Sequence, residues 1–323
     1  MTTEQKPIRS GFGEQTTAAE VLAGIDLTGK FAIVTGGYSG IGVETTRVLS
    51  QAGATVVVPV RTMDKAKVNL QGIDRVELQP LDLHDPVSID AFAGAYVASG
   101  RPLHMLVNSA GIMAPPLTRD ARGYESQFSA NHLGHFQLAL GLWPALKRAG
   151  GARVVAVSSR GHQRAGVDFD DPNFERRDYD KWQGYGQSKT ANALFAMEVD
   201  RRGARDGIRA FSLHPGAIIT DLARHMTEDD IKAFGIVRAA DGSLILGADS
   251  PWRFKTVPQG AATLVWCATN PQLDGMGGVY CENCDIAQAV PADHKPLDGV
   301  LPWAIDEAAA ERLWTLSEQL TGV

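Results

Sequence analysis

The chain has 323 residues, and its 31 lysines and arginines against 37 aspartates and glutamates give a formal net charge of −6 at pH 7. An acidic chain of ordinary composition is not expected to bind nucleic acid, because nucleic-acid binders present a basic face. No apolar run approaches the roughly 18 residues that a membrane-spanning helix needs, so we expect no membrane span. The polar N-terminus lacks the apolar core of a signal peptide, and three cysteines are too few for a disulfide framework, which favours a cytoplasmic protein.

Residues 1–25 are predicted to form an N-terminal arm with a short helix, because Thr17 and Glu20 have the spacing of a capping box. Behind this arm, short β-branched runs alternate with helical patterns, which predicts a single α/β domain over residues 26–290. We expect a Rossmann-type, doubly wound parallel sheet of about seven strands with helices on both faces. The expected strands are 31–35, 55–60, 76–82, 104–111, 152–159, 208–216 and 278–283. The expected helices are 40–53, 86–99, 121–149, one that begins near 185, and 258–269. Residues 217–256 read as irregular, and residues 291–323 as a tail with an amphipathic helix near 304–320.

A glycine-rich turn, TGGYSGIG, joins the first expected strand to the following helix. Gly36, Gly40 and Gly42 would let the backbone approach a pyrophosphate closely. The N-terminus of the helix would add free N–H groups and a partial positive charge. Because the turn lies inside a βαβ unit, it predicts a dinucleotide site; the alternative is a tight turn that binds nothing.

The spacing of these glycines resembles the glycine motif of the short-chain dehydrogenases/reductases. Three further stretches match that family in the right order: NSAG at 108–111, Tyr-x-x-x-Lys at 185–189, and HPG at 214–216 followed by Thr220. NHLGHF at 131–136 and YGQSKTANALF at 185–195 look most like the branch of retinol dehydrogenases and WW-domain-containing oxidoreductases. The resemblance spans about 27–290 and implies an enzyme that oxidises CH–OH donors with NAD(P), or runs the reverse reduction.

Transfer of hydride from an alcohol carbon requires removal of the hydroxyl proton, so a group of tunable pKa must contact the substrate oxygen. Tyr185 and Lys189 are four residues apart and would share a helix face, where the ammonium would lower the pKa of the tyrosine. The resemblance implies that Ser159, in preference to Ser158, holds the substrate oxygen. It also implies that Asn131 anchors a water between Lys189 and solvent. The alternative for the tyrosine and lysine is an ordinary surface pair.

The second expected strand ends at Val60, and Arg61 follows where an acid would select NAD(H) by repelling a 2′-phosphate. Because an arginine fork can pair with that phosphate, we expect NADP(H). NAD(H) stays an alternative, since Tyr38 and Ser39 stand where many relatives carry a second basic residue, and Arg61 could also be an ordinary loop residue. The residues expected to contact the cofactor, most of them by resemblance, are Gly36, Tyr38, Ser39, Gly40, Ile41, Gly42, Arg61, Asp82, Leu83, Asn108, Ala110, Gly111, Tyr185, Lys189, Pro215, Gly216, Ile218 and Thr220.

By resemblance, residues 217–256 form a lid over the substrate. Apolar side chains there and in neighbouring loops suggest a hydrophobic alcohol or carbonyl substrate, although they could equally be plain core. They are Leu222, Met226, Phe234, Ile236, Trp252, Phe169, Phe174, Tyr179, Trp182, Ile112, Met113 and Pro115. Members of the family commonly pair through the helices that begin near 121 and 185, so a homo-oligomer, dimer or tetramer, is expected.

No metal site is expected. Cys281 and Cys284 form a Cys-x-x-Cys without a second ligand pair, and the histidines at 132, 135, 162 and 214 lack ligand spacing. Three other functions stay open on this scaffold: a reductase of C=C or C=N bonds, a non-catalytic dinucleotide sensor, and an isomerase or dehydratase that retains the hydride. The complete serine, tyrosine and lysine set favours the alcohol or carbonyl oxidoreductase over all three.

Overall fold

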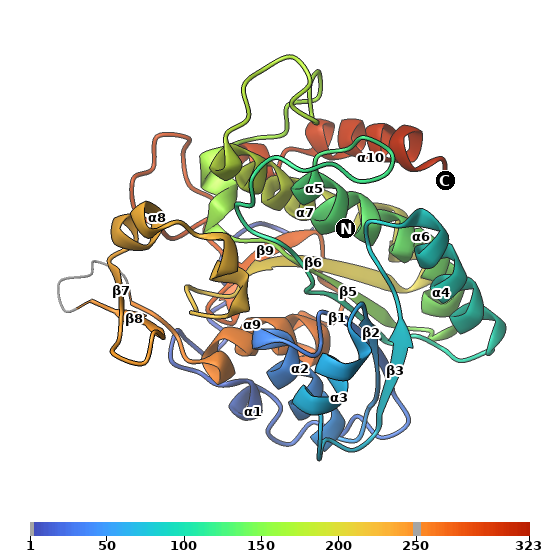
Figure 1. Ribbon diagram of the computed structural model, residues 1–323. Coiled ribbons are helices and arrows are strands. Elements are labelled where there is room, and N and C mark those ends of the chain that lie inside the picture. The colour runs from blue at the N-terminus through green and yellow to red at the C-terminus, as the bar shows by residue number, and fades with distance from the viewer. Residues whose placement is uncertain (1–2, 248–252) are drawn as a thin grey trace.

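Parallel strands form the centre of the computed structural model, which describes residues 3–247 and 253–323 (Figure 1). Across the sheet of the described chain, seven parallel strands run in the order β3-β2-β1-β4-β5-β6-β9, and a short β10 pairs antiparallel with β9. This confirms the expected doubly wound sheet, with β10 as an addition. The strands are β1 (Phe31–Thr35), β2 (Thr55–Val60), β3 (Val76–Pro80), β4 (Met105–Asn108), β5 (Ala152–Val157), β6 (Ile208–His214), β9 (Val279–Glu282) and β10 (Asp285–Ile286).

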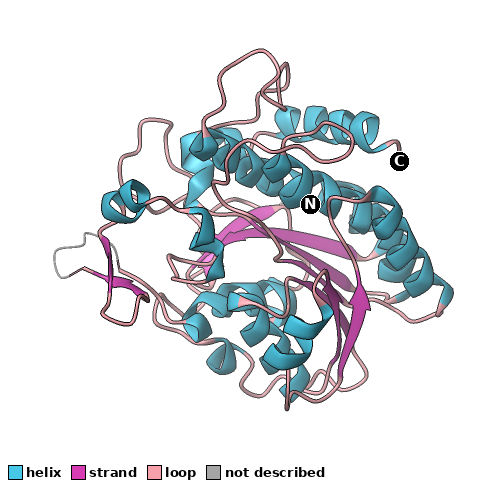
Figure 2. Ribbon diagram, in the orientation of Figure 1, coloured by secondary structure: helices cyan, strands magenta, loops and turns pink. Residues whose placement is uncertain are grey.

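Helices cover both faces of the sheet (Figure 2). One layer holds α1 (Ala18–Val21), α2 (Gly40–Gln51) and α9 (Val257–Thr269); the other holds α4 (Pro86–Ala98), α6 (Gly134–Arg148) and α7 (Lys181–Gly203). Along β1, Val34 packs into the first layer and Ile33 into the second. Strands covered on both faces in this way explain why the sequence shows apolar runs instead of alternation. The short α3 (Met63–Asn69) follows β2.

The helix expected over 121–149 begins later and is interrupted. It consists of α5 (Ser126–Phe128), a π-helical turn η1 (Ser129–Leu133) and α6. It begins where it does because the buried Glu125 carboxylate accepts the N–H groups of Gln127 and Phe128, a carboxylate cap on the first free donors. In the same way α7 begins at Lys181, ahead of the expected 185, because Asp180 accepts the N–H groups of Trp182 and Gln183.

The lid segment, read from the sequence as irregular, has secondary structure of its own. It holds a 3₁₀ turn η4 (Asp221–His225), a helix α8 (Glu228–Ala233) and a small hairpin of β7 (Ile236–Arg238) and β8 (Leu244–Leu246). Asp230 anchors the lid to the domain, since its carboxylate accepts hydrogen bonds from the Lys181 ammonium and from Trp182 Nε1. Trp252 lies outside the described residues.

Both ends of the chain pack on the domain. The capping box of Thr17 and Glu20 is formed as expected. The C-terminal helix α10 (Glu307–Thr321) lies along α7, where the Trp314 ring meets Phe136 at 4.9 Å between centroids. Because α10 covers part of α7, subunits that pair through α7 would have to use the rest of its surface.

The homo-oligomer, the cytoplasmic location and the division at residues 25 and 290 stay predictions. No helix in the described part of the chain is both long and apolar enough to cross a membrane.

Candidate active site

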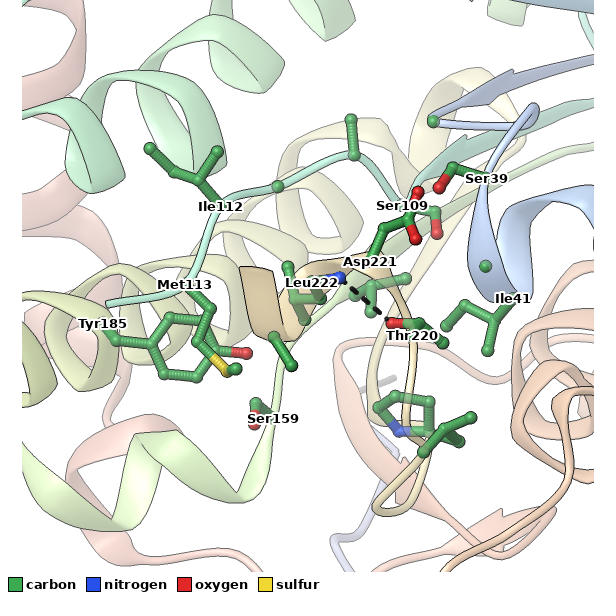
Figure 3. A pocket seen from close by; sticks show the side chains of 18 of the residues that line it. Ser39, Ile41, Ser109, Ile112, Met113, Ser159, Tyr185, Thr220, Asp221 and Leu222 are labelled. Carbon is green, nitrogen blue, oxygen red and sulfur yellow. Dashed lines mark hydrogen bonds between the residues drawn. The ribbon is translucent and has the colours of Figure 1, made fainter. Parts of the chain in front are cut away.

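A cavity of about 630 Å³ opens at the carboxyl ends of the parallel strands (Figure 3). Its wall includes Thr35 at the end of β1, Ser109 after β4, Ser159 after β5 and Pro215 after β6. The strand order reverses between β1 and β4, so the cavity lies at the topological switch point where open α/β sheets bind ligands. The expected site residues in its wall are Gly36, Tyr38, Ser39, Gly40, Ile41, Arg61, Asp82, Leu83, Ala110, Gly111, Ser159, Tyr185, Lys189, Pro215, Gly216, Ile218 and Thr220.

Three expected residues are not in the cavity wall: Gly42, Asn108 and Asn131. Gly42 is required for the fold of the turn itself, because a Cβ atom there would lie 2.2 Å from the Gly36 carbonyl oxygen. The Asn108 amide is buried beneath the end of β4 and has no hydrogen-bond partner among the described residues.

The start of α2 fits a pyrophosphate. Ser39 occupies the N-cap position but makes no side-chain hydrogen bond to the helix. Gly36 has a φ of +66°, and a Cβ atom there would lie 3.0 Å from the Cα of Ala110, so a side chain would crowd the turn. An uncapped helix N-terminus behind a glycine turn suits a dinucleotide phosphate.

Arg61 lies at the adenosine end of the expected site, exposed at the carboxyl end of β2. Its guanidinium makes no ion pair with any residue of the described ranges. Lys65, one turn into α3, also lines the cavity, and its ammonium lies 2.6 Å from the Asp221 carboxylate of η4. This bridge between α3 and the lid was missed from the sequence, where the only signal was a second basic residue four positions after Arg61.

Ser159 and Tyr185 meet at the other end of the cavity (Figure 3). The Ser159 oxygen accepts the Gly161 N–H at 3.0 Å. Burial raises the pKa of Tyr185 to about 12, and the neighbouring Ser159 hydroxyl opposes that rise. The expected net lowering of this pKa is therefore wrong for the polypeptide by itself, because removal of the phenolate from water is the largest cause and raises the pKa.

Lys189 lies below the tyrosine on the same face of α7, with Nζ 5.6 Å from the centroid of the Tyr185 ring. Nζ donates to the Val157 carbonyl oxygen at 2.9 Å. Burial lowers the pKa of Lys189 to about 8. The i, i+4 spacing thus brings the two groups together as the sequence predicted, but the burial that sets both pKa values is a property of the folded cavity.

The geometry also separates the two candidate serines. Ser158 Oγ donates to the Lys189 carbonyl oxygen at 2.7 Å, so this hydroxyl ties β5 to α7. The Ser159 side chain lines the cavity with Tyr185 and affects the pKa of that tyrosine; its role toward the substrate oxygen stays a prediction.

Asn131 has a supporting position in η1. Its Oδ1 accepts the Ile112 N–H at 2.9 Å, and its Nδ2 donates to the Ile112 carbonyl oxygen and to Ser188 Oγ, both at 3.0 Å. These bonds hold the loop after β4 against α7. A water relay from Asn131 to Lys189 stays a prediction.

Part of the cavity wall, where the substrate is expected, is apolar. Ile112, Met113, Trp182, Leu222, Met226, Phe234 and Ile236 line it as expected, and Phe254 and Leu297 add to it. Leu297 shows that the C-terminal tail reaches the cavity, which nothing local in the sequence indicates. Phe169, Phe174, Tyr179 and Pro115 do not line the cavity. The Tyr179 hydroxyl, for example, bonds Gln127, Glu125 and the Pro115 carbonyl oxygen beneath the loop.

The histidines near the motifs are buried. Burial lowers the pKa of His132 to about 3 and those of His135 and His162 to about 4, so these rings are neutral at physiological pH. No cluster of three or more His, Cys, Asp or Glu side chains suited to a metal occurs in the described chain. Cys284 is buried, and burial raises the pKa of its thiol to about 12.

The comparisons with known proteins agree with this geometry. Residues 30–231 match the family model described as short chain dehydrogenase. A probable oxidoreductase of Streptomyces lividans is 45% identical, over 90% of this chain and 97% of its own. The WW domain-containing oxidoreductase of Homo sapiens is 35% identical, over 97% of this chain and 73% of its own. A solved structure of a putative uncharacterized protein from Mycobacterium paratuberculosis has a TM-score of 0.72 at 31% identity, covering 96% of this chain and 98% of that one. The chain therefore belongs to the short-chain dehydrogenases/reductases, and its fold and family are those of a dinucleotide-dependent oxidoreductase.

Proposed function

We propose that this oxidoreductase uses NADP(H) to interconvert a hydrophobic primary or secondary alcohol and its aldehyde or ketone. One observation carries the proposal: the Ser159–Tyr185 pair and the uncapped N-terminus of α2 open into the same cavity. A proton-transfer group and a phosphate site in the same cavity suit the binding of one dinucleotide.

In the direction of reduction, the Ser159 hydroxyl and the Tyr185 phenol both donate toward the carbonyl oxygen of the substrate. A bound nicotinamide dinucleotide supplies the hydride in this direction and accepts it in the other. The raised pKa of Tyr185 keeps the phenol protonated at neutral pH, so it can deliver its proton as the carbonyl oxygen becomes a hydroxyl. In the direction of oxidation Tyr185 must first be ionised, so the rate of oxidation should rise with pH.

Lys189 and Asn131 support this pair in the proposal. The Lys189 ammonium favours the ionised tyrosine by attraction through the buried cavity, where charges are poorly screened. Asn131 holds Ile112 and Ser188, which places the loop after β4 and the helix that carries Tyr185 relative to each other. Its effect on turnover would be indirect, through position.

The preference for NADP(H) rests on Arg61. Its exposed guanidinium lies in the cavity wall at the end of β2 and is not engaged by an acid of the described residues, so it can pair with a 2′-phosphate. Lys65 lines the same wall, but its ammonium is paired with the Asp221 carboxylate. An enzyme that prefers NAD(H) is the alternative, and it predicts faster turnover with NADH than with NADPH.

The apolar end of the cavity supports a hydrophobic substrate. Trp182 and Phe234 lie with their ring centroids 5.2 Å apart at the junction of α7 and the lid. Aromatic walls of this kind suit aromatic, terpenoid, retinoid-like or lipid-derived alcohols and carbonyls.

The test is a substrate panel read at the nicotinamide absorbance band with NADPH, NADH and their oxidised forms. The panel contains benzaldehyde, menthone, all-trans-retinal and the corresponding alcohols. We expect turnover of at least one pair, faster with NADP(H), and a loss of about 10²–10⁴-fold in Tyr185→Phe. Turnover in Tyr185→Phe equal to wild type would refute the mechanism, and a preference for NADH would refute the cofactor assignment.

A further inference from the structure

The peptide group between Ser159 and Arg160 is held on both sides by buried histidines. His162 Nδ1 lies 2.7 Å from the Ser159 carbonyl oxygen, and the Arg160 N–H donates to His214 Nδ1 at 3.2 Å. The hydroxyl of Tyr280 donates to the same Ser159 carbonyl at 3.2 Å. Because the Ser159 side chain projects from this peptide, the groups that hold it also place the hydroxyl at the cavity wall.

The protons of this cluster can be assigned from its geometry. The Leu301 N–H lies 3.3 Å from His162 Nε2, and a backbone N–H can only donate, so Nε2 carries no proton. The neutral ring must then carry its proton on Nδ1 and donate it to the Ser159 carbonyl oxygen. The burial that lowers the pKa of His162 to about 4 keeps the ring in this neutral form at physiological pH.

Both ends of the chain converge on this cluster. Leu301 belongs to the C-terminal segment, and two residues later Trp303 Nε1 donates to the His162 carbonyl oxygen at 2.8 Å. At the other end, Gln5 brackets the backbone of Tyr280: Gln5 Oε1 accepts its N–H and Gln5 Nε2 donates to its carbonyl oxygen, both at 2.8 Å. The Tyr280 and His162 rings pack with centroids 4.9 Å apart, so the two supports of Ser159 also support each other.

We propose that His162 is a positioning residue of the active site. Its Nδ1–H holds the Ser159 carbonyl oxygen, and its Nε2 accepts the Leu301 N–H. His162 thereby links the C-terminal segment to the placement of the Ser159 hydroxyl. The proposal rests on the proposed function, in which that hydroxyl contacts the substrate oxygen. A small displacement of such a group is costly, because near-attack geometry tolerates little error.

The first test reads the tautomer and needs no activity. In ¹⁵N-labelled protein, the His162 side-chain nitrogen signals, assigned by their absence from His162→Gln, should show a protonated Nδ1 and an unprotonated Nε2 at pH 7. A protonated Nε2 would overturn the proposal.

The second test separates the two hydrogen bonds. In His162→Asn the amide Nδ2 can still donate to the Ser159 carbonyl but nothing accepts the Leu301 N–H. In His162→Gln the longer side chain can accept the Leu301 N–H, but the shortest of the three donors to the Ser159 carbonyl oxygen is lost. The backbone N–H of residue 162, at 3.0 Å in the wild type, and the Tyr280 hydroxyl, at 3.2 Å, remain. With the fastest substrate of the panel, kcat of the Gln variant should be about tenfold below that of the Asn variant, the size of one lost hydrogen bond. NADPH affinity, measured by fluorescence titration, should be alike in both variants, and equal kcat values would overturn the proposal.

Tyr280→Phe covers the case in which the Gln variant does not fold. It removes the Tyr280 donor to the Ser159 carbonyl together with the contact of that hydroxyl to His162 Nδ1 at 3.2 Å. We therefore expect kcat to fall about threefold or more at unchanged NADPH affinity. A wild-type kcat in Tyr280→Phe would count against the proposal.

Ser159→Ala distinguishes failure of this proposal from failure of the proposed function. If Ser159→Ala turns over like wild type, the proposed function fails. If Ser159→Ala is slow but the two His162 variants are equal, only the positioning role fails. In the Ser159→Ala background, His162→Gln should lower kcat no further, because a residue that acts through Ser159 has nothing left to place.

Discussion

Gly161 lies against the ring of Tyr185 so closely that a Cβ atom at position 161 would be 2.8 Å from both Cδ1 and Cε1 of the ring. Non-bonded carbon atoms in packed interiors do not come that close to each other, so any side chain at 161 would push the ring aside. The glycine two residues after Ser159 thus leaves the space that the Tyr185 ring occupies.

Gly161→Ala should therefore lower kcat by about tenfold or more, because the Tyr185 hydroxyl moves away from the substrate oxygen. Gly166→Ala is the matched control in the same loop, since a Cβ atom there would meet Trp303 at an ordinary 3.8 Å. Steady-state kinetics with the fastest panel substrate give the comparison. Equal kcat in the two variants would show that the ring position does not limit the reaction.

The two adjacent serines should respond differently to the same substitution. Ser159→Ala removes a donor to the reacting oxygen and should lower kcat by about 10²-fold or more. Ser158→Ala removes the bond to the Lys189 carbonyl oxygen and should cost about 1 kcal/mol of unfolding free energy, with a much smaller change in kcat. Urea unfolding and kinetics measure both; the reverse pattern would exchange the roles of the serines.

Arg61→Ala should weaken NADPH far more than NADH, by about ten- to a hundredfold, because one charge-assisted bond to the 2′-phosphate is lost. Lys67→Ala is the control, since Lys67 is exposed on α3 and does not line the cavity. Fluorescence titration of each variant with each cofactor gives the ratio. An equal loss for NADPH and NADH would mean that Arg61 only stacks on the adenine.

Lys189→Met should stabilise the fold at pH 7 while it impairs turnover. The pKa of Lys189 is about 8 in the folded protein against 10.5 for a free lysine, so the folded state resists the charged form. The unfolded chain then binds more protons between pH 8 and 10.5, and the stability of the wild type rises with pH across that window. The Lys189→Met substitution removes the free-energy cost of burying the charged ammonium. That cost is at most about 3 kcal/mol at pH 7 and falls toward zero as the pH approaches 10.5.

Thermal unfolding of Lys189→Met and wild type at pH 7 and pH 10 measures this effect, with the exposed Lys67→Met as the control that should change little. A Lys189→Met variant less stable than wild type at pH 7 would mean that the bond from Nζ to the Val157 carbonyl outweighs the cost of burying the charge.

Much of the fold could be predicted because its signals are local. The β-branched runs gave the seven parallel strands within one or two residues at most ends, and the glycine turn and the Tyr-x-x-x-Lys spacing placed the cavity wall. Helix boundaries set by capping residues were harder to predict from the sequence. The start of α7 depends on the Asp180 carboxylate and the start of α5 on the Glu125 carboxylate.

The sequence by itself determined the order of strands and helices, the glycine turn at α2 and the shared helix face of Tyr185 and Lys189, because each depends on neighbours within about four residues. Only the tertiary structure decided which apolar side chains line the cavity, bringing in Leu297 and leaving out Phe169 and Tyr179. It also decided the direction of the Tyr185 pKa shift and the support of Ser159 by His162. Burial and contacts between distant segments arise only when the chain closes on itself, so no local spacing encodes them.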